Sequence, residues 1–290
     1  MKLEIDKIPL SEISYDTFVE NYLIPEKPLI ITGIKSRENQ EITSEYVKKY
    51  FQDISQKSIG WYDAPLNLSD KTLPSFLHQV FAREDISLRT LPMRIFMQPS
   101  GHKTLYHYDG NSLHGFNLQI KGKKHWYLIS PHTPTDFAPL MFVALVGKSF
   151  IPDADKYDYY EFETSAGEML FLPRYWVHSV STRAEENINY NWVMTPTFPN
   201  NTSPLGRRES ELLFLRKKIP FINRFLVDAY DEYGGAGETI IEEYIKDIGY
   251  IRMCIRIAKE IAQIPKTLLL FKEIKRMASE FEKNNFKVEG

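Results

Sequence analysis

The segment 104–109 (TLYHYD) places an imidazole and a carboxylate two residues apart, at His107 and Asp109. In an extended strand, residues i and i+2 share one face, so both side chains can point at the same ion. A histidine from a distant strand would complete a set of two histidines and one carboxylate, which leaves other positions of an octahedral ferrous ion open. His178 follows a proline-containing turn and opens another predicted strand, so it is the candidate third ligand. The alternative for His107 and Asp109 is a simple hydrogen bond at a strand edge, because His-x-Asp is a short motif.

A run of short strands is predicted around these candidate ligands, between residues 91 and 199. Segments rich in β-branched and aromatic residues alternate there with Gly and Pro turn signals. They are Arg94–Gln98, Gly115–Ile120, His125–Ile129, Tyr159–Glu163, Glu168–Leu172, His178–Thr182 and Asn187–Met194. Many short strands at this spacing predict an antiparallel sandwich or barrel. Residues 130–158 contain four prolines and predict a long loop over one mouth of that barrel.

Two flanking regions predict a mainly β fold with helical additions. Residues 1–90 predict an α/β segment that packs on the barrel, and residues 207–285 predict a helical region. The apolar residues of the second region recur at helical spacing, and we expect this stripe to build a homodimer, with capping of the barrel as the alternative. The expected elements are helices at Tyr15–Tyr22, Tyr46–Phe51, Leu73–Phe81, Pro220–Glu232 and Glu238–Ala262, another helix from Pro265, and a strand at Pro28–Thr32.

Composition excludes several other classes of protein. The 290 residues include 36 basic and 38 acidic side chains, so the net charge is −2, without the basic footprint of a nucleic-acid binder. The single cysteine, Cys254, excludes a disulfide framework or a zinc module of cysteine ligands within the chain. The sequence has neither an apolar signal-peptide run nor an apolar stretch of membrane-spanning length. A cytoplasmic protein is therefore expected.

Several motifs in the same order resemble the JmjC (jumonji C) cupin-like family of 2-oxoglutarate oxygenases. Residues 94–129 and 159–194 resemble the family's two metal-bearing halves, and residues 18–33 are similar to its amino-terminal segment. The matching motifs are TLYHYDG (104–110), QIKGKKHW (119–126), GEMLFLPRYWVH (167–178) and INYNW (188–192). The resemblance covers roughly residues 10–195 and implies a double-stranded β-helix, the jelly roll of the cupins.

The resemblance also implies a site and an activity. It implies that His107, Asp109 and His178 bind Fe(II), which the co-substrate 2-oxoglutarate chelates. Lys124 matches the lysine that binds the distal carboxylate of the co-substrate, a task suited to a flexible point charge, and Thr104 matches its hydroxyl partner. Without the resemblance, Lys124 would be read as a solvated lysine, as Lys121 and Lys123 are expected to be. Thr104 would be read as a threonine that favours a strand by its β-propensity.

One departure from the family affects the asparagines. Twelve positions separate His107 from Gln119, two more than in the asparaginyl hydroxylase of the hypoxia pathway, a member of this family. We assign Asn117, which shares strand parity with Gln119, and Asn191 to the cofactor, with Asn189 as the alternative to Asn191. Four other histidines lack family counterparts and are expected in loops or on the surface, with His114 a candidate for the entrance: His102, His114, His125 and His132. The segment Trp61–Asp63 is expected to form a packed aromatic turn, with a contribution to a substrate groove as the alternative.

The expected reaction is hydroxylation of a C–H bond, most readily on a protein or peptide side chain. A small molecule, a modified tRNA base and N-demethylation remain alternatives, although the chain lacks the Cys-rich module that often accompanies histone demethylases. A cupin metalloenzyme that does not use 2-oxoglutarate is another reading, but it would leave Lys124 and Thr104 unexplained. A third alternative is a catalytically inactive binding module, and the intact metal ligands argue against it.

Overall fold

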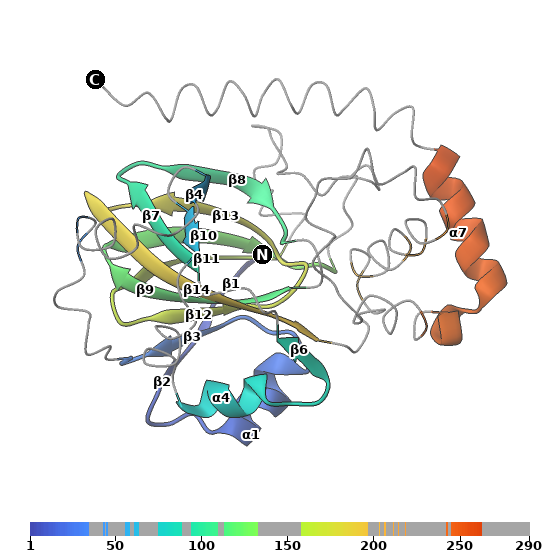
Figure 1. Cartoon of the computed structure of the whole chain (residues 1–290), viewed down its shortest axis with the longest axis horizontal. Helices are drawn as coiled ribbons and strands as arrows, with labels where there is room; N and C mark the ends of the chain where they lie inside the picture. The colour runs from blue at the N-terminus through green and yellow to red at the C-terminus, as the bar shows by residue number, and fades with distance from the viewer. Residues whose placement is uncertain are drawn as a thin grey trace.

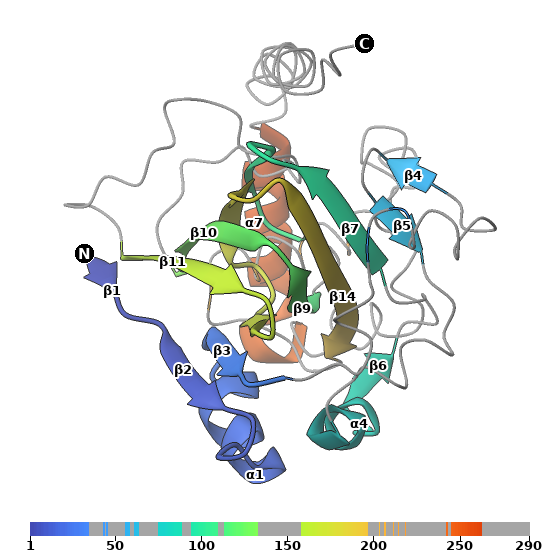
Figure 2. The same cartoon turned by 90° about the vertical axis from the view of Figure 1, so that its left-hand side faces the viewer.

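Two mixed β-sheets face each other in the computed structural model (Figures 1 and 2). The structure describes residues 1–34, 56–58, 61–63, 75–88, 94–109, 113–132, 158–196 and 245–262, with a few isolated positions between them. The smaller sheet contains, in order, β1 (Lys2–Leu3), β11 (Tyr159–Ser165), β10 (Lys123–Ile129), β13 (Val177–Thr182) and β8 (Lys103–His107).

The larger sheet draws strands from both the first 90 residues and the predicted core. Its order is β2 (Asp6–Pro9), β3 (Leu29–Thr32), β12 (Met169–Leu172), β9 (His114–Lys121), β14 (Glu186–Pro196), β7 (Arg94–Pro99), β5 (Trp61–Asp63) and β4 (Gln56–Ser58), and β6 (Ile86–Leu88) also pairs with β14. The two sheets form a jelly roll, so the predicted mainly β fold with a cupin-type core is confirmed.

Alternation of side chains along the strands of the larger sheet separates two cores. The outer core lies under the helices of the first 90 residues, and the inner core fills the space between the sheets. Outer-core strand residues include Ile95, Met97, Phe116, Leu118, Met169, Phe171, Ile188, Tyr190, Trp192 and Met194. Inner-core residues include Ile30, Trp126, Leu128, Leu170, Leu172 and Val180. The residues between the outer-core positions of β7, β9 and β14 therefore face the barrel interior.

Three short helical segments cover the outer face of the larger sheet (Figure 1). They are α1 (Tyr15–Phe18), the π-helical η1 (Val19–Leu23) and α4 (Ser75–Phe81). The Ser14 hydroxyl accepts a hydrogen bond from the Thr17 amide at 3.1 Å and caps α1. The Phe18 ring then packs 5.0 Å from that of Phe171 on β12. This contact anchors the helical layer to the barrel.

The predicted strands are confirmed, and the strands of the predicted core pair with one another in antiparallel fashion, as expected. The sheets are mixed because strands of the first 34 residues join them, β1 pairing with β11 and β2 with β3 in parallel. Two other expectations about β-structure are wrong. The segment Trp61–Asp63 is a strand that pairs with β7, not an aromatic turn. Strand β8 ends at His107, so Asp109 lies beyond the strand and strand parity does not position it. The predicted helix Tyr46–Phe51 and most of the predicted loop 130–158 lie outside the described residues.

The carboxy-terminal region contains α7 (Tyr250–Ala262), which lies at one end of the barrel (Figures 1 and 2). The predicted continuous helix Glu238–Ala262 is interrupted at Gly249, whose φ of +82° ends one helical segment before α7 begins. The other two helices predicted for this region, Pro220–Glu232 and the one from Pro265, lie outside the described residues. Within the described part of the chain, no helix has both the length and the apolar character needed to cross a membrane.

Candidate metal and co-substrate site

His178 lies in the barrel interior with one ring nitrogen directed at Asp109. Its side chain is buried on β13, and its Nδ1 lies 2.9 Å from the Trp176 carbonyl oxygen. A carbonyl accepts only from a protonated nitrogen, so Nδ1 carries a hydrogen, and in the neutral imidazole Nε2 then has the lone pair. That Nε2 lies 4.0 Å from Asp109 Oδ1. A histidine oriented by a backbone carbonyl, with its other nitrogen facing a carboxylate, is arranged as metal ligands are.

A β-bulge brings residues of β8 to inward-facing register positions. His107 pairs with His178 and Thr104 pairs with Val180, so three residue steps on β8 oppose two on β13. Residues three apart face opposite sides of a regular strand, and the extra residue removes that difference. The backbone thus places His107 directly opposite His178. The side chain of His107 is outside the described set, and among the side chains described, no cluster of three metal-ligating groups forms.

The turn before His178 is held by a buried ion pair that the sequence did not predict. Arg174 is 1% exposed, and its Nε lies 2.5 Å from Glu26 Oε1. The indole Nε1 of Trp176 donates to the Glu26 carbonyl oxygen at 2.9 Å. Between these two residues, Tyr175 has a φ of +66°, a left-handed conformation that costs a non-glycine residue energy. Glu26 therefore fixes the strained turn from which β13 delivers His178.

Lys124 is a cation buried in the barrel interior. Its side chain is 4% exposed, and its Nζ lies 5.2 Å from the Phe96 ring centroid and 6.0 Å from that of Trp126. Among the described residues, no carboxylate forms an ion pair with it. Burial consequently lowers the pKa of Lys124 to about 7. Lys123 is exposed and Lys121 pairs with Glu186, as expected for the two neighbouring lysines.

Thr104 and His102 lie next to the lysine across the smaller sheet. Lys124 pairs with Thr182 on β13, and the Thr182 amide donates to the His102 carbonyl oxygen at 2.9 Å. The His102 imidazole is 8% exposed, and its Nε2 lies 3.5 Å from the hydroxyl oxygen of Thr104. The expectation of a loop or surface histidine at position 102 is therefore wrong. Its strand parity with Thr104 was the signal that would have found it.

Asn117 and Asn191 form an amide pair on the opposite wall of the interior. The two residues are register partners on β9 and β14, and Asn191 Nδ2 donates to Asn117 Oδ1 at 2.9 Å. Gly115 makes room for them, because a Cβ there would lie 3.3 Å from Asn117 Nδ2. Asn189 shares the inward parity of Asn191, and its buried Oδ1 has no hydrogen-bond partner among the described residues. Both asparagines of the second motif thus face inward.

Of the other histidines expected in loops or on the surface, His114 is buried and His132 is exposed. His114 is fully buried beside Phe171 in the outer core, and its Nδ1 accepts from the Arg174 amide at 3.1 Å, so it does not line the entrance. Burial, followed by the charge of Arg174, holds the pKa of His114 well below its usual value. The expectation for His114 is therefore wrong, whereas His132 is exposed, as expected.

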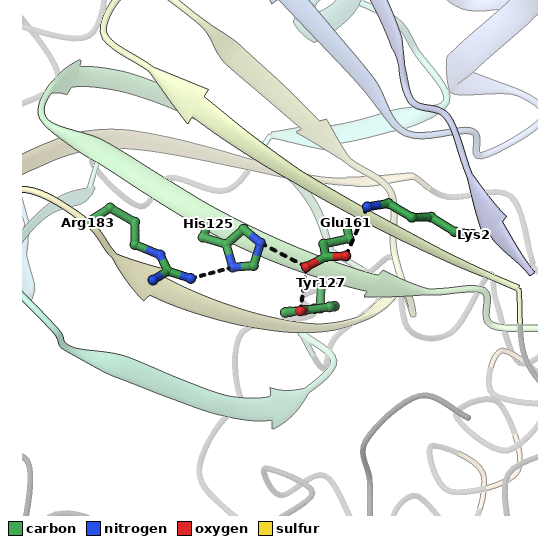
Figure 3. A network of polar contacts seen from close by, with 5 residues as sticks. All are labelled: Lys2, His125, Tyr127, Glu161 and Arg183. Carbon is green, nitrogen blue, oxygen red and sulfur yellow. Dashed lines mark hydrogen bonds and ion pairs between the residues drawn. The ribbon is translucent and has the colours of Figure 1, made fainter. Parts of the chain in front are cut away.

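His125 belongs to a polar network on the outer face of the smaller sheet (Figure 3). Its Nε2 lies 3.3 Å from Glu161 Oε1, and its Nδ1 lies 3.2 Å from Arg183 Nη2. The Tyr127 hydroxyl and the Lys2 ammonium also donate to Glu161, at 2.5 Å and 3.0 Å. These hydrogen bonds lower the pKa of Glu161. Trp126, between the two β10 residues of this network, faces inward, so the network lies on the far side of the sheet from His178.

The residues of the interior fit a metal with a chelating dicarboxylate. An imidazole whose Nε2 faces a carboxylate can bind a divalent cation, and His107 is the register partner of that imidazole. The buried Lys124 ammonium on β10, together with the Thr104 hydroxyl on β8, two strands along the same sheet, can bind a carboxylate. The inner core beside these residues is apolar.

Comparison with known proteins agrees with this geometry. Residues 65–198 match the family model of the cupin-like domain. The matched segment includes all seven residues predicted for the site, from Thr104 to Asn191. Fold and match together define the class of this region, a jelly roll of the cupin-like type. A search of curated proteins found no match for the chain.

Proposed function

We propose that this protein is an Fe(II)- and 2-oxoglutarate-dependent oxygenase that hydroxylates a C–H bond. The observation that carries the proposal is Lys124, a buried ammonium for which no described residue supplies a carboxylate partner. Burying a charge is costly unless a partner compensates, so such a group is suited to an anionic ligand. The distal carboxylate of 2-oxoglutarate is an anion of this kind. A cupin without 2-oxoglutarate would leave this lysine unexplained.

The residues of the interior divide the task of holding metal and co-substrate. His178 and Asp109, together with His107, would bind the iron, and the Trp176 carbonyl orients the His178 ring so that Nε2 would be the ligand atom. Lys124 and Thr104 would bind the distal carboxylate, and the Asn117–Asn191 pair would contact the co-substrate from the opposite wall. When bound, iron and 2-oxoglutarate supply the oxygen chemistry: dioxygen oxidises 2-oxoglutarate to succinate and carbon dioxide, and the substrate C–H becomes C–OH.

For the substrate we propose a protein or peptide side chain. The motifs are similar to those of the asparaginyl hydroxylase of the hypoxia pathway, whose substrate is of this kind. The net charge of −2 offers no general attraction for a tRNA, which makes a modified base the weaker choice. Incubation with peptide libraries, read by a mass increase of one oxygen, separates peptide substrates from small molecules.

The iron site is tested by anaerobic titration with Fe(II) and 2-oxoglutarate, followed by visible absorption. The wild-type protein is expected to develop the weak metal-to-ligand band of the chelate. His178→Ala should lose the band because it removes the inward ligand. His125→Ala, on the outer face of the same sheet, should keep it. Bound iron without a band would favour a cupin that uses other chemistry, and absence of bound iron would favour a binding module.

A further inference from the structure

His102 is a buried imidazole next to the proposed co-substrate pocket, with no role so far in the proposed function. It precedes β8, is 8% exposed and has no counterpart among the motifs that led to the site. Its position is fixed by one backbone contact within its own turn and one with β13. The His102 amide donates to the Pro99 carbonyl oxygen at 3.3 Å, and its own carbonyl accepts from Thr182 at 2.9 Å.

The turn that carries His102 is tied to the same β13 residue that pairs with Lys124. The Thr182 hydroxyl donates to the Pro99 carbonyl oxygen at 2.5 Å, and the Gly101 amide donates to the Thr182 carbonyl oxygen at 3.2 Å. Gly101 has a φ of +76°, which lets the chain reverse tightly into β8. Lys124, Thr182 and His102 thus form one row across three neighbouring segments.

The side chain of His102 reaches the hydroxyl that is proposed to bind the co-substrate. Its Nε2 lies 3.5 Å from Thr104 Oγ1, a long hydrogen bond of the kind that shortens when a ligand binds. Burial, followed by the charge of Lys124, lowers the pKa of His102 to about 4. The imidazole is therefore neutral at physiological pH and has one N–H to donate.

We propose that His102 is a positioning residue of the co-substrate pocket, whose Nε2–H donates to Thr104 Oγ1 and so directs the hydroxyl hydrogen at the distal carboxylate. This inference rests on the proposed function. The Thr104 hydroxyl has one hydrogen to donate. If no group donates to the hydroxyl oxygen, this hydrogen can point at several acceptors, including His102 Nε2. With Nε2 as the donor, the Thr104 hydrogen and the Lys124 ammonium both serve the same carboxylate. The neutral imidazole adds no second positive charge beside the buried lysine.

The test compares 2-oxoglutarate with pyruvate, which can chelate the metal through the same 2-oxo acid group but has no distal carboxylate. Dissociation constants are measured by calorimetry on the full chain loaded with Mn(II), which keeps the experiment independent of turnover. His102→Leu should weaken 2-oxoglutarate binding by about 2- to 10-fold, the effect of one neutral hydrogen bond, and leave pyruvate binding unchanged. His102→Gln, which retains a donor near the Nε2 position, should bind 2-oxoglutarate like the wild type.

A double-mutant cycle shows whether His102 acts through Thr104. In a Thr104→Val background, His102→Leu should have no further effect on 2-oxoglutarate binding. The inference is overturned if His102→Leu binds 2-oxoglutarate like the wild type, if it weakens both acids equally, or if its effect persists without the Thr104 hydroxyl. If the leucine variant does not fold, His102→Asn, with an amide too short to reach Thr104, replaces it. Failure of the wild type to bind 2-oxoglutarate would instead remove the proposed function itself.

Discussion

The buried ammonium of Lys124 is unfavourable in the free protein, but it provides a binding group for an anionic ligand. Its neighbours Lys121 and Lys123 have the same chemistry, yet only Lys124 is buried: Lys121 lies at the end of β9, and β10 turns Lys124 inward and Lys123 outward. Burial lowers the pKa of its ammonium to about 7, since the charged form has no carboxylate among the described residues to stabilise it. An anionic co-substrate would supply that stabilisation, so proton binding and co-substrate binding are coupled at this position.

The first prediction, at the residue scale, is a pH dependence of 2-oxoglutarate affinity. Below about pH 7, Lys124 of the free protein is already charged. Its protonation state then does not change on binding, so it makes no contribution to a change of affinity with pH. Above that pH the free lysine is neutral, while the bound carboxylate favours the charged form, so binding must take up a proton. The affinity should therefore fall as pH rises, by up to about tenfold per pH unit, the limit for uptake of one proton. Calorimetry in buffers of different ionisation enthalpy measures the proton uptake. Constant affinity between about pH 7 and 9, with no proton uptake, would contradict the coupling.

The residues proposed to bind metal and co-substrate could be predicted from the sequence, but most of their side-chain contacts could not. Resemblance to a family pointed to His178, Lys124 and Thr104, and the structure places all three side chains at the barrel interior or next to it. Neither the His102 contact with Thr104 nor the Glu26–Arg174 ion pair was predicted. Both depend on where a turn places a side chain relative to segments far along the chain, which neither periodicity nor short motifs encode. Burial of His114 was missed for the same reason.

At the scale of elements, the β9–β10 hairpin sets the position of Lys124. Gly122 forms its turn with a φ of +79°, and a Cβ there would collide with the Glu186 carbonyl oxygen and lie 2.6 Å from Asn187 Oδ1. Asn187 in turn accepts from the Lys123 amide at 3.1 Å. The hairpin is thus locked to the start of β14, two residues before Asn189 and four before Asn191. The positions of Lys124 and of the asparagine wall are coupled through this turn.

The second prediction compares two glycines with similar φ angles and different surroundings. A Cβ added to Gly33, which has a φ of +77°, would meet no described atom within 4 Å, whereas at Gly122 it would meet backbone. Gly33→Ala should destabilise the fold by about 1–2 kcal/mol, the cost of a left-handed residue. Gly122→Ala should exceed that by about 1–3 kcal/mol because of overpacking, and it alone should weaken 2-oxoglutarate binding. Chemical denaturation measures the stability. Equal losses for the two variants would show that the close approach at Gly122 is unimportant.

Element types were predictable where the pattern was regular. The alternating strands of the core and the helical start at Tyr15 follow directly from side-chain periodicity and capping. The parallel edge strands β1 and β2 were missed because they are short and lack a clear alternation. The β8 bulge was missed because a bulge changes pairing without changing composition. Gly249 was read as an interior helix position, although a glycine can adopt the positive φ that separates two helices.

At the scale of the whole molecule, α7 has an exposed apolar face. Ile251 is 76% exposed and Ile255 is 52% exposed, while Met253 and Ile257 of the same helix are buried. The apolar stripe predicted from sequence thus includes residues that the chain itself leaves in contact with solvent. We propose that a second copy of the chain covers them, as expected from an apolar face that a monomer does not bury.

The third prediction concerns this homodimer. Light scattering should give twice the 33.9 kDa mass of the chain for the wild type, and the chain mass for the double variant Ile251→Lys, Ile255→Lys. Two charges in the interface would remain desolvated without partners, which is enough to separate the copies. Ile24→Lys is the matched control, because Ile24 is 58% exposed on the helical layer of the first 90 residues. A monomeric wild type, or a dimer that persists in the double variant, would contradict the proposal.

The central claim is that the buried lysine of this jelly roll binds the distal carboxylate of 2-oxoglutarate. The most direct measurement is the dissociation constant of 2-oxoglutarate for the metal-loaded protein, compared between Lys124→Met and Lys123→Met. Methionine keeps most of the lysine's length and removes its charge, and a charge-assisted contact contributes about 1.5–3 kcal/mol. Lys124→Met should therefore bind at least about tenfold more weakly, and Lys123→Met, altered at the exposed neighbouring position, should bind like the wild type. Equal affinity for all three proteins would show that Lys124 does not hold the co-substrate.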